Sequence, residues 1–458
     1  MITDTIAAIA TGLTNSGISI IRISGPDSFA IASKVFKVKS GMFDAAYAES
    51  HTIHYGHVVD EKGESVDEAM LALFKAPRSY TKEDVVEIDC HGGVVVTRRI
   101  LDLILSAGAR IAEPGEFTKR AFLNGRIDLS KAEAVIDIIN AKNSMALKNS
   151  VKQLGGVELR QISAVREQII HDTAFIEAAL DDPEHYSLDG FGEELKANVN
   201  KSIDLVEKML GSANNGRLIS EGINTVIVGK PNAGKSTLLN AILGEDRAIV
   251  TDIAGTTRDT LEETATFEGI TLNIIDTAGI RETGDVIEQI GVERAYSAAD
   301  NADLILYVVD RARKLDDNDK QIIEKLKDRK VIVLVNKSDL PSEADLSAID
   351  VLKAPTIEIS AKEGFGLVEL GDKIKEMFFG GEITANDEVL ITSERHKECL
   401  MEAYASLKSV VQSVDDGMSE DFFTIDLMSA YSSLGMIIGE DTDEDLINRI
   451  FKDFCMGK

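Results

Sequence analysis

The sequence has 458 residues, of which 44% are hydrophobic, 28% are charged and only 7 are proline. At about 150 residues per domain this length predicts roughly three domains, and the composition excludes a disordered or collagen-like chain. The 49 basic and 78 acidic residues give a formal net charge of -29, which opposes sequence-independent adhesion to DNA or RNA. Any RNA contact is therefore expected to be local or shared with a partner.

The cysteines and the N-terminus bear on the compartment. Cys90, Cys399 and Cys455 lie far apart without CxxC spacing, which argues against a disulfide framework or a structural zinc site and favours a reducing cytosol. Residues 1–11 lack a basic region and a cleavage signature, and no run of about 18 apolar residues follows. The sequence predicts a cytoplasmic protein with no membrane span.

The first predicted domain covers residues 1–118. Short β-branched runs such as Ile18–Ile23 and Val85–Ile88 alternate with two helical stretches, one near Ser28 and one near Val94. This pattern predicts a small α+β domain.

Helical periodicity replaces the strand pattern in residues 119–218, where apolar residues such as Val135, Ile138 and Ile139 recur at helical spacing. After a Gly-Gly break the chain turns helical again through residues 382–458. The two helical halves flank a block of different pattern. We expect a single helical domain, built from two chain segments, into which that block is inserted.

The block at residues 219–381 alternates β-rich runs with helical segments, which predicts an α/β domain with a parallel sheet. Its first strand, Ile223–Val228, is followed at once by Gly229-Lys230-Pro231-Asn232-Ala233-Gly234-Lys235-Ser236, which matches the phosphate-loop pattern. Backbone N–H groups of such a loop surround the phosphates, Lys235 reaches the β- and γ-phosphates, and Ser236 offers a hydroxyl to magnesium. The block is predicted to be a P-loop nucleotide-binding domain.

Three later motifs complete a guanine-nucleotide site. Asp276-Thr277-Ala278-Gly279 ends a predicted strand and brings a carboxylate to the magnesium shell. In Asn336-Lys337-Ser338-Asp339, the aspartate can accept from the N1–H and amine of guanine, which adenine does not offer. Ser360-Ala361-Lys362 follows the last strand, where its backbone can touch the guanine O6. Over the whole inserted block, these motifs in this order resemble the translation-factor-like GTPases.

The residue that orients the attacking water is not fixed by these motifs. Ras-like GTPases use a glutamine directly after Asp-x-x-Gly, but Ile280 stands there. The downstream acids Glu282, Asp285 and Glu288 are alternatives, because a carboxylate can accept from water. Between the first two motifs, Thr251–Asp259 contains two adjacent hydroxyls, and spacing does not decide which of them reaches magnesium.

The predicted GTP contacts are Asn232, Ala233, Gly234, Lys235, Ser236, Thr237, Thr251, Asp252, Ile253, Ala254, Gly255, Thr256, Thr257, Asp276, Thr277, Ala278, Gly279, Asn336, Lys337, Asp339, Ser360, Ala361 and Lys362.

The last residues read Ile450-Phe451-Lys452-Asp453-Phe454-Cys455-Met456-Gly457-Lys458. Taken alone, Cys455 is most simply a buried cysteine on a last helix, and Gly457 and Lys458 do not fit a prenylation signal. Taken with the GTPase block, the tail resembles the tRNA-modifying GTPase MnmE (TrmE) family, whose members end in Phe-Cys-x-Gly-Lys. The alternative role for Cys455 is that of a reactive thiol.

The N-terminal block adds to this resemblance, which spans essentially the full chain. The segments Ile20–Gly25, Ser79–Asp84, His91–Gly93 and Pro114–Gly125 all look like segments of the family. Two departures are the Thr11–Gly17 stretch, where the family has a glycine-rich segment, and Arg126, where the family has lysine.

The resemblance implies a homodimer that binds GTP and forms a heterotetramer or larger complex with the FAD-dependent partner MnmG (GidA), which carries the FAD. Together they modify carbon 5 of the wobble uridine of certain tRNAs with an aminomethyl or carboxymethylaminomethyl group. The one-carbon donor would be 5,10-methylenetetrahydrofolate, for which 5-formyltetrahydrofolate is an analogue. Matching the family position by position implies folate contacts at Arg22, Glu87, Arg126 and Lys458, potassium ligands at Asn232, Thr251, Ile253 and Thr256, magnesium ligands at Ser236 and Thr257, and a water-positioning carboxylate at Glu288.

Two alternatives remain open at this point. Residues 97–131 carry 7 basic and 4 acidic side chains, a local charge of +3 that fits either a tRNA patch or a mixed solvated surface. A GTPase that acts only as a ribosome-assembly factor is the second function considered. The acidic bulk of this chain and the folate-like N-terminal block favour tRNA modification.

Overall fold

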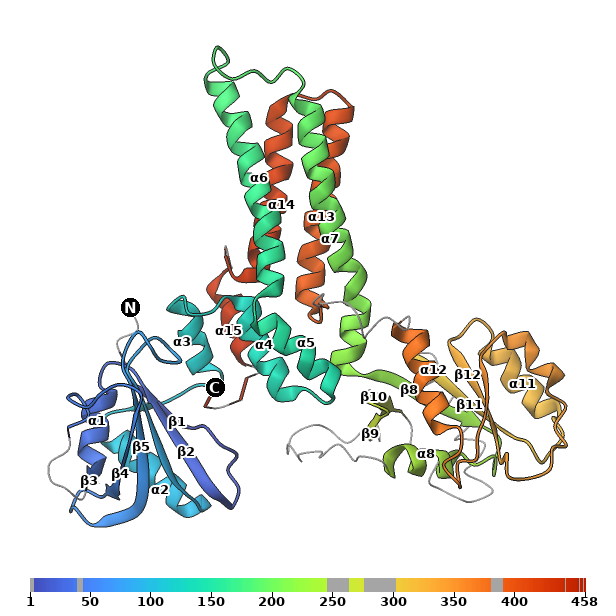
Figure 1. Ribbon diagram of the computed structural model, residues 1–458, viewed down its shortest axis with the longest axis horizontal. Coiled ribbons are helices and arrows are strands. Elements are labelled where there is room, and N and C mark those ends of the chain that lie inside the picture. The colour runs from blue at the N-terminus through green and yellow to red at the C-terminus, as the bar shows by residue number, and fades with distance from the viewer. Residues whose placement is uncertain are drawn as a thin grey trace. The chain divides into compact units, whose positions relative to one another are not determined.

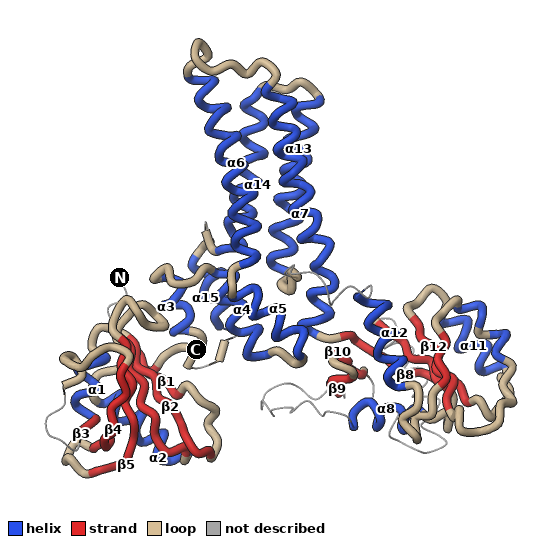
Figure 2. Tube along the Cα trace, viewed as in Figure 1, coloured by secondary structure: helices blue, strands red, loops and turns tan. Residues whose placement is uncertain are grey.

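The structure is a computed structural model, and it describes residues 4–38, 44–244, 263–275, 302–379, 390–440, 442–452, 454–455 and 457–458. The chain divides into two compact units. The first comprises Met1–Ile136, Gln153–Arg166 and Tyr431–Lys458, and the second comprises Asp137–Lys152 and Glu167–Ala430. Figures 1 and 2 show the elements of both units.

A seven-stranded sheet in the order β3-β4-β5-β6-β2-β1-β7 forms the first unit's α+β part. Neighbouring strands are antiparallel, except that β1 and β7 are parallel. The strands are β1 (Ile6–Ile9), β2 (Ser16–Ser24), β3 (Phe36–Val38), β4 (Thr52–Val59), β5 (Ser65–Phe74), β6 (Val85–Gly92) and β7 (Arg110–Ile111). The helices α1 (Ser28–Val35) and α2 (Val94–Ser106) belong to the same part.

The two faces of this sheet differ. Ile21 and Ile23 of β2, with Ile88 of β6, share a hydrophobic core with α1 and α2. Because successive side chains on a strand alternate between faces, Arg22 on β2 and its register partner Glu87 on β6 lie on the opposite face. That second face therefore carries two of the predicted folate contacts.

The remaining helical part of the first unit comes from both ends of the chain. It includes α3 (Glu116–Leu123), most of α4 (Leu129–Asn140) and α15 (Glu444–Lys452). Leu129 and Ala132 of α4 pack with Ile447 and Phe451 of α15 and with Phe454 beyond it. Segments more than 300 residues apart in the sequence thus share one core.

The second unit contains a six-stranded sheet in the order β13-β12-β11-β8-β10-β9. Its strands are parallel except for β9, which pairs antiparallel with β10. The strands are β8 (Ile223–Gly229), β9 (Glu263–Phe267), β10 (Ile270–Ile274), β11 (Leu304–Asp310), β12 (Val331–Asn336) and β13 (Thr356–Glu358).

Helices cover both faces of this sheet, which makes the domain doubly wound (Figure 1). The helices α8 (Lys235–Gly244) and α12 (Leu367–Phe379) share one core with the sheet, and α11 (Asp317–Leu326) shares the other. The short 3-10 helices η1 (Leu346–Ala348) and η2 (Asp350–Leu352) lie between β12 and β13. Strands buried on both faces read as continuous apolar runs, as in β12.

The second unit also contains long helices. The helices α7 (Phe191–Glu221) and α13 (Glu394–Asp415), which precede and follow the α/β domain in the sequence, pack side by side (Figure 1). This unit further contains most of α5 (Ser144–Leu154), the later part of α6 (Val157–Asp181) and the earlier part of α14 (Glu420–Ile438). The α/β domain is therefore an insertion between two packed helices.

The predicted fold class is confirmed: an N-terminal α+β domain, a helical part from two chain segments and an inserted P-loop α/β domain. Residue 118, where the first domain was predicted to end, lies within α3, and residue 218 lies in the last turns of α7. Among the residues that the structure describes, no helix is both long and apolar enough to cross a membrane.

Candidate functional site

The phosphate loop lies between β8 and α8, in the strand-to-helix position that its sequence predicts. Gly234 has a φ of 103°, and a Cβ atom there would lie 2.0 Å from the Nδ2 atom of Asn336. Asn232 has a φ of 62° and an exposed side chain. The glycine lets the loop approach β12 closely, while the asparagine faces solvent, where it can reach a cation.

The lysine of the loop folds back over it. The Nζ atom of Lys235 donates to the carbonyl oxygens of Gly229 at 2.8 Å and Lys230 at 2.9 Å. Ser236 and Thr237 follow on the first turn of α8 with exposed side chains. An ammonium group and hydroxyls at a helix N-terminus suit the phosphates and the magnesium ion of a nucleotide.

Asn336 ties three of the predicted motifs together. It is 3% exposed, its Nδ2 atom donates to the carbonyl of Ala233 at 2.8 Å, and its Oδ1 atom accepts from the N–H of Ala361 at 3.0 Å. The phosphate loop and the two base-recognition segments are thus fixed against one another.

Three further side chains of the base-recognition segments are also held in place. The Ser360 hydroxyl donates to Asp339 at 2.8 Å, and this hydrogen bond is the main cause that lowers the pKa of Asp339. The Nζ atom of Lys337 pairs with Asp310 at 2.6 Å. Asp339 therefore stays ionised at neutral pH and can accept two hydrogen bonds from guanine.

Several predicted site residues lie outside the described residues. They are Thr251, Asp252, Ile253, Ala254, Gly255, Thr256, Thr257, Asp276, Thr277, Ala278, Gly279 and Glu288.

A second cluster gathers the predicted folate contacts in the first unit. The Nε atom of Arg22 donates to Glu87 at 2.7 Å, and both side chains are mostly buried. The guanidinium groups of Arg22 and Arg126 lie 5.4 and 4.8 Å from the centre of the Tyr80 ring. Tyr80, which the sequence did not single out, places the two arginines around one aromatic ring.

The C-terminal tail reaches the same cluster. The Nη1 atom of Arg22 donates to the carbonyl of Gly457 at 3.1 Å, and the N–H of Phe117 donates to the main-chain oxygen of Lys458 at 3.2 Å. Gly457 has a φ of 89°, and a Cβ atom there would lie 2.4 Å from the carbonyl oxygen of Ile9. The tail is therefore seated against β1, in a position that only glycine fills easily.

The cysteine of the tail is accessible. Cys455 follows α15, its side chain is exposed, and its carbonyl accepts from the N–H of Gly115 at 3.3 Å. The simplest expectation, a buried cysteine on a last helix, is wrong, because Phe454 rather than Cys455 fills the core beside Phe451.

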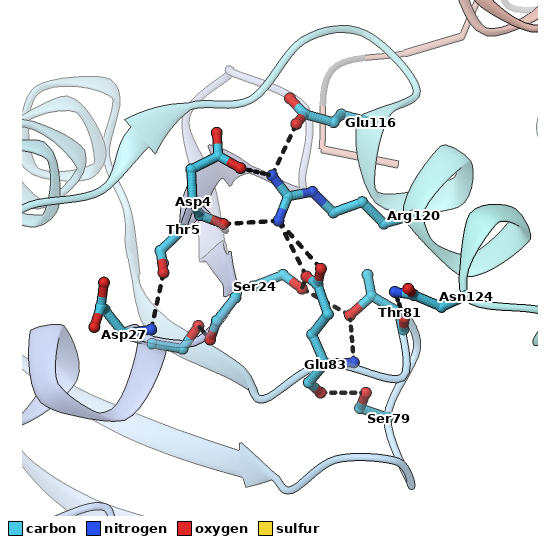
Figure 3. Close-up of polar contacts among 12 residues, drawn as sticks. Asp4, Thr5, Ser24, Asp27, Ser79, Thr81, Glu83, Glu116, Arg120 and Asn124 are labelled. Carbon is cyan, nitrogen blue, oxygen red and sulfur yellow. Dashed lines mark hydrogen bonds and ion pairs between the residues drawn. The ribbon is translucent and has the colours of Figure 1, made fainter. Parts of the chain in front are cut away.

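A buried arginine, Arg120, lies at the centre of a network of polar contacts in the first unit (Figure 3). Arg120 is 1% exposed, and it pairs with Glu116 at 3.0 Å, Asp4 at 2.9 Å and Glu83 at 3.2 Å. Burial alone would raise the pKa of Glu116, but hydrogen bonds led by that from Arg110 lower it overall. The network joins α3 to the start of β1 and to the loop that carries Tyr80.

This network also corrects the charge count over residues 97–131. Arg120 is buried and pairs with Asp4 and Glu83, and Arg110 pairs with Asp4 at 2.7 Å, so two acids from outside the segment offset part of its positive charge. The local sum of +3 therefore overstates the positive surface of this segment.

The fold and the first site define the chain as a multidomain protein with an inserted P-loop domain suited to guanine nucleotides. Comparison with known families then agrees with this class. The model of the GTP-binding protein TrmE N-terminus matches residues 5–126, and the model of the MnmE helical domain matches residues 129–455. The chain belongs to the MnmE family of tRNA modification GTPases.

Two full-length relatives support the assignment. The tRNA modification GTPase MnmE of Lachnoclostridium phytofermentans is 58% identical over 459 residues, covering 100% of both chains. That of Acetivibrio thermocellus is 47% identical, covering 99% of both chains. Among solved structures, a variant of Aquifex aeolicus Era bound to GDP.AlF4- is 31% identical, covers 40% of this chain and 66% of its own, and has a TM-score of 0.27. The G domain of the T. maritima FeoB iron transporter is 28% identical, covers 34% of this chain and 97% of its own, and has a TM-score of 0.26.

Proposed function

We propose that the protein is the GTP-hydrolysing subunit of a complex that modifies carbon 5 of the wobble uridine of certain tRNAs, installing an aminomethyl or carboxymethylaminomethyl group. The observation that carries the GTP part is the position of Asn336, which holds the phosphate loop against the segment that bears Ala361. The purified protein should hydrolyse GTP and not ATP. Asp339→Asn should weaken GTP binding and admit xanthosine nucleotides, whereas an unchanged preference for GTP would refute the base assignment.

The proposed catalytic ions are magnesium and potassium. Magnesium would be held by Ser236 and Thr257. Of these two, Ser236 lies within the described residues, at the start of α8, which is where a phosphate-loop magnesium ligand is expected. Potassium would be held by Asn232, Thr251, Ile253 and Thr256, and the exposed side chain of Asn232 on the phosphate loop supports this assignment. Potassium would supply positive charge where other GTPases use an arginine, and Glu288 would position the attacking water.

The potassium proposal has a direct test. Turnover of GTP should be much faster in potassium than in sodium at equal ionic strength. Asn232→Ala should remove this difference and leave the sodium rate nearly unchanged. Equal rates in the two salts for the unaltered protein would show that the site does not exist.

The proposed one-carbon donor is 5,10-methylenetetrahydrofolate, bound by Arg22, Glu87, Arg126 and Lys458. The support is the short pair between Arg22 and Glu87 on the sheet face away from α1 and α2, with Arg126 across the Tyr80 ring. Arginines suit the carboxylates and ring acceptors of a folate, and a glutamate suits the amine and N–H donors of the pterin. Arg22→Ala in the full chain should abolish binding of 5-formyltetrahydrofolate while GTP binding persists.

The protein is proposed to act in the cytoplasm as a homodimer, with MnmG (GidA) as the partner that carries FAD. The sheet face that bears Arg22 also exposes apolar side chains: Ile18 is 57%, Ile53 66%, Tyr55 58% and Met70 40% exposed. An apolar face of this kind suits a second copy. Tyr55→Asp should yield monomers in light scattering, and Tyr47→Asp, at a position 88% exposed in the same unit, should not.

We further propose that the chain is organised as predicted, with a folate-binding and dimerisation domain at 1–118, a helical domain at 119–218 and 382–458, and a GTPase domain at 219–381. The core shared by α4 and α15, and the pairing of α7 with α13, support the two-segment helical domain.

A further inference from the structure

Helix α5 lies outside the GTPase domain in the sequence, but it is packed into that domain's core. Ala146 of α5 is 5% exposed and belongs to the same hydrophobic cluster as Phe267 of β9 and Ile270 of β10. Met145 packs against the same cluster. These apolar contacts bring α5 close to the sheet. They do not by themselves set the orientation of α5 relative to the sheet, because the hydrophobic effect is not directional.

Two buried asparagines, Asn143 directly before α5 and Asn149 within it, add directional contacts. Asn143, 9% exposed, donates from Nδ2 to the carbonyl of Ile219 at 3.1 Å and to the hydroxyl of Thr271 at 2.8 Å. Ile219 lies in α7 just before the chain enters β8, and Thr271 lies in β10. Asn143 therefore holds the segment that leads into the GTPase domain and one strand of its sheet.

The second asparagine holds the segment that leads out. Asn149, 6% exposed, donates from Nδ2 to the carbonyl of Leu390 at 3.0 Å and accepts at Oδ1 from the N–H of the same residue at 2.9 Å. The next residue, Ile391, donates its N–H to the hydroxyl of Ser212 at 3.2 Å. Its carbonyl would lie 2.0 Å from a Cβ atom at Gly216, so α7 accepts this segment only because glycine stands there.

Capping of α5 does not account for these contacts. Asn143 precedes the helix, and its Oδ1 atom accepts from the N–H of Ala146 at 2.8 Å, which is an N-terminal cap that serine or aspartate would also provide. The Nδ2 atom takes no part in capping, and both of its hydrogen bonds go to Ile219 and Thr271. The Nδ2 group of Asn143 therefore has a role separate from helix formation.

We propose that Asn143 and Asn149 are positioning residues that seat the GTPase domain on α5 and pass the state of its nucleotide site to the helical domain. The link to the nucleotide is β10, because this strand bears Thr271 and leads in sequence directly to the Asp276-Thr277-Ala278-Gly279 motif. A change at that motif that shifts β10 would act on α5 through Asn143. The proposal rests on the proposed function, since it assigns these residues a part in GTP-driven tRNA modification.

The most informative variants separate the hydrogen bond between Asn143 and Thr271 from the capping of α5. Asn143→Asp keeps the cap oxygen and loses the donor, and Thr271→Val removes the acceptor at the other end with almost no change of shape. Thr264→Val on the neighbouring strand is the matched control, because its hydroxyl bonds to Asn273 at 3.2 Å and not to α5. If Asn143→Asp fails to fold, Thr271→Val still gives the answer.

The position of the GTPase domain relative to the helices of the second unit can be measured as the distance between two spin labels. Ser347→Cys in η1 and Ser409→Cys in α13 replace exposed serines, and Cys455→Ser removes the exposed native thiol. Labelled protein is diluted with unlabelled protein so that distances within one chain dominate. The unaltered protein and Thr264→Val should give one narrow distribution, and Asn143→Asp and Thr271→Val should broaden it.

Function is measured in unlabelled proteins that retain Cys455. Asn143→Asp and Thr271→Val should leave GTP affinity and turnover within about twofold, and should lower wobble-uridine modification roughly five- to a hundredfold, the usual size of coupling between two sites. Unchanged distances together with normal modification would overturn the proposal. Absence of GTP hydrolysis in the unaltered protein would instead overturn the proposed function. The label distances would still show whether Asn143 and Thr271 hold the GTPase domain in position.

Discussion

Replacing Arg120 by methionine removes the buried cation that holds Asp4, Glu83 and Glu116. Breaking a buried ion pair by deleting one partner costs about 3–5 kcal/mol, because the partner charges remain desolvated. At about 2–4 °C per kcal/mol for a unit of this size, the transition of the first unit should fall by roughly 6–20 °C. Scanning calorimetry of the full chain measures this shift, with Arg99→Met on the exposed side of α2 as the control.

The second unit should be unaffected by this change. Arg120→Met should therefore leave GTP turnover intact and weaken binding of 5-formyltetrahydrofolate, because the loop that carries Tyr80 loses its support. The ionised forms of Glu116 and Asp4 are favoured in the folded state, where the pKa of each carboxyl is lowered. The stability they contribute is present above their unfolded pKa values and is lost as pH falls below about 4.

The difference in melting temperature between Arg120→Met and the unaltered protein should consequently shrink on acidification through that range. A transition that stays in place at neutral pH, or a loss of GTP turnover equal to the loss of folate binding, would refute the account of this network.

Three further predictions concern the sites. Asn336→Ala should lower GTP affinity by about tenfold or more in calorimetric titration, because it leaves a buried carbonyl and a buried N–H without partners; an unchanged affinity would contradict its role as a tie. Tyr80→Leu should raise the Kd for 5-formyltetrahydrofolate about fivefold, roughly 1 kcal/mol, whereas Tyr80→Phe keeps the ring and should change it little; equal effects of the two would show that the ring does not order the arginines. Maleimide at pH 8 should modify Cys455, which is exposed, and spare Cys90, because burial raises the pKa of that thiol to about 11; modification of Cys90 at the same rate would contradict its burial.

The positions of the described residues of the candidate nucleotide site could be predicted from the sequence because these residues lie close to one another in local motifs. The phosphate loop occupies one strand-to-helix turn, so spacing alone places Lys235 and Ser236 on α8. Asn336 ends β12, whose apolar run identifies it as a buried strand, and Asp339 follows that strand. Parallel strands bring their carboxyl ends to one edge of the sheet.

The supports of the two sites could not be predicted in this way. Arg22 meets the carbonyl of Gly457 across 435 residues of sequence, and Asn149 meets Leu390 across 241. A buried arginine such as Arg120 reads in the sequence like any charged surface residue, and Asn143 reads like a helix cap. Only the fold shows that their remaining hydrogen-bonding groups are directed to distant segments.

The central claim is that GTP hydrolysis in this chain drives tRNA modification. It is tested most directly by mass spectrometry of the wobble uridine in tRNA from cells whose sole copy of the gene encodes Glu288→Ala, with GTP affinity and turnover measured on the same purified variant. The account predicts GTP affinity nearly unchanged, turnover lowered by orders of magnitude and the modification absent. Full modification together with abolished hydrolysis would contradict it.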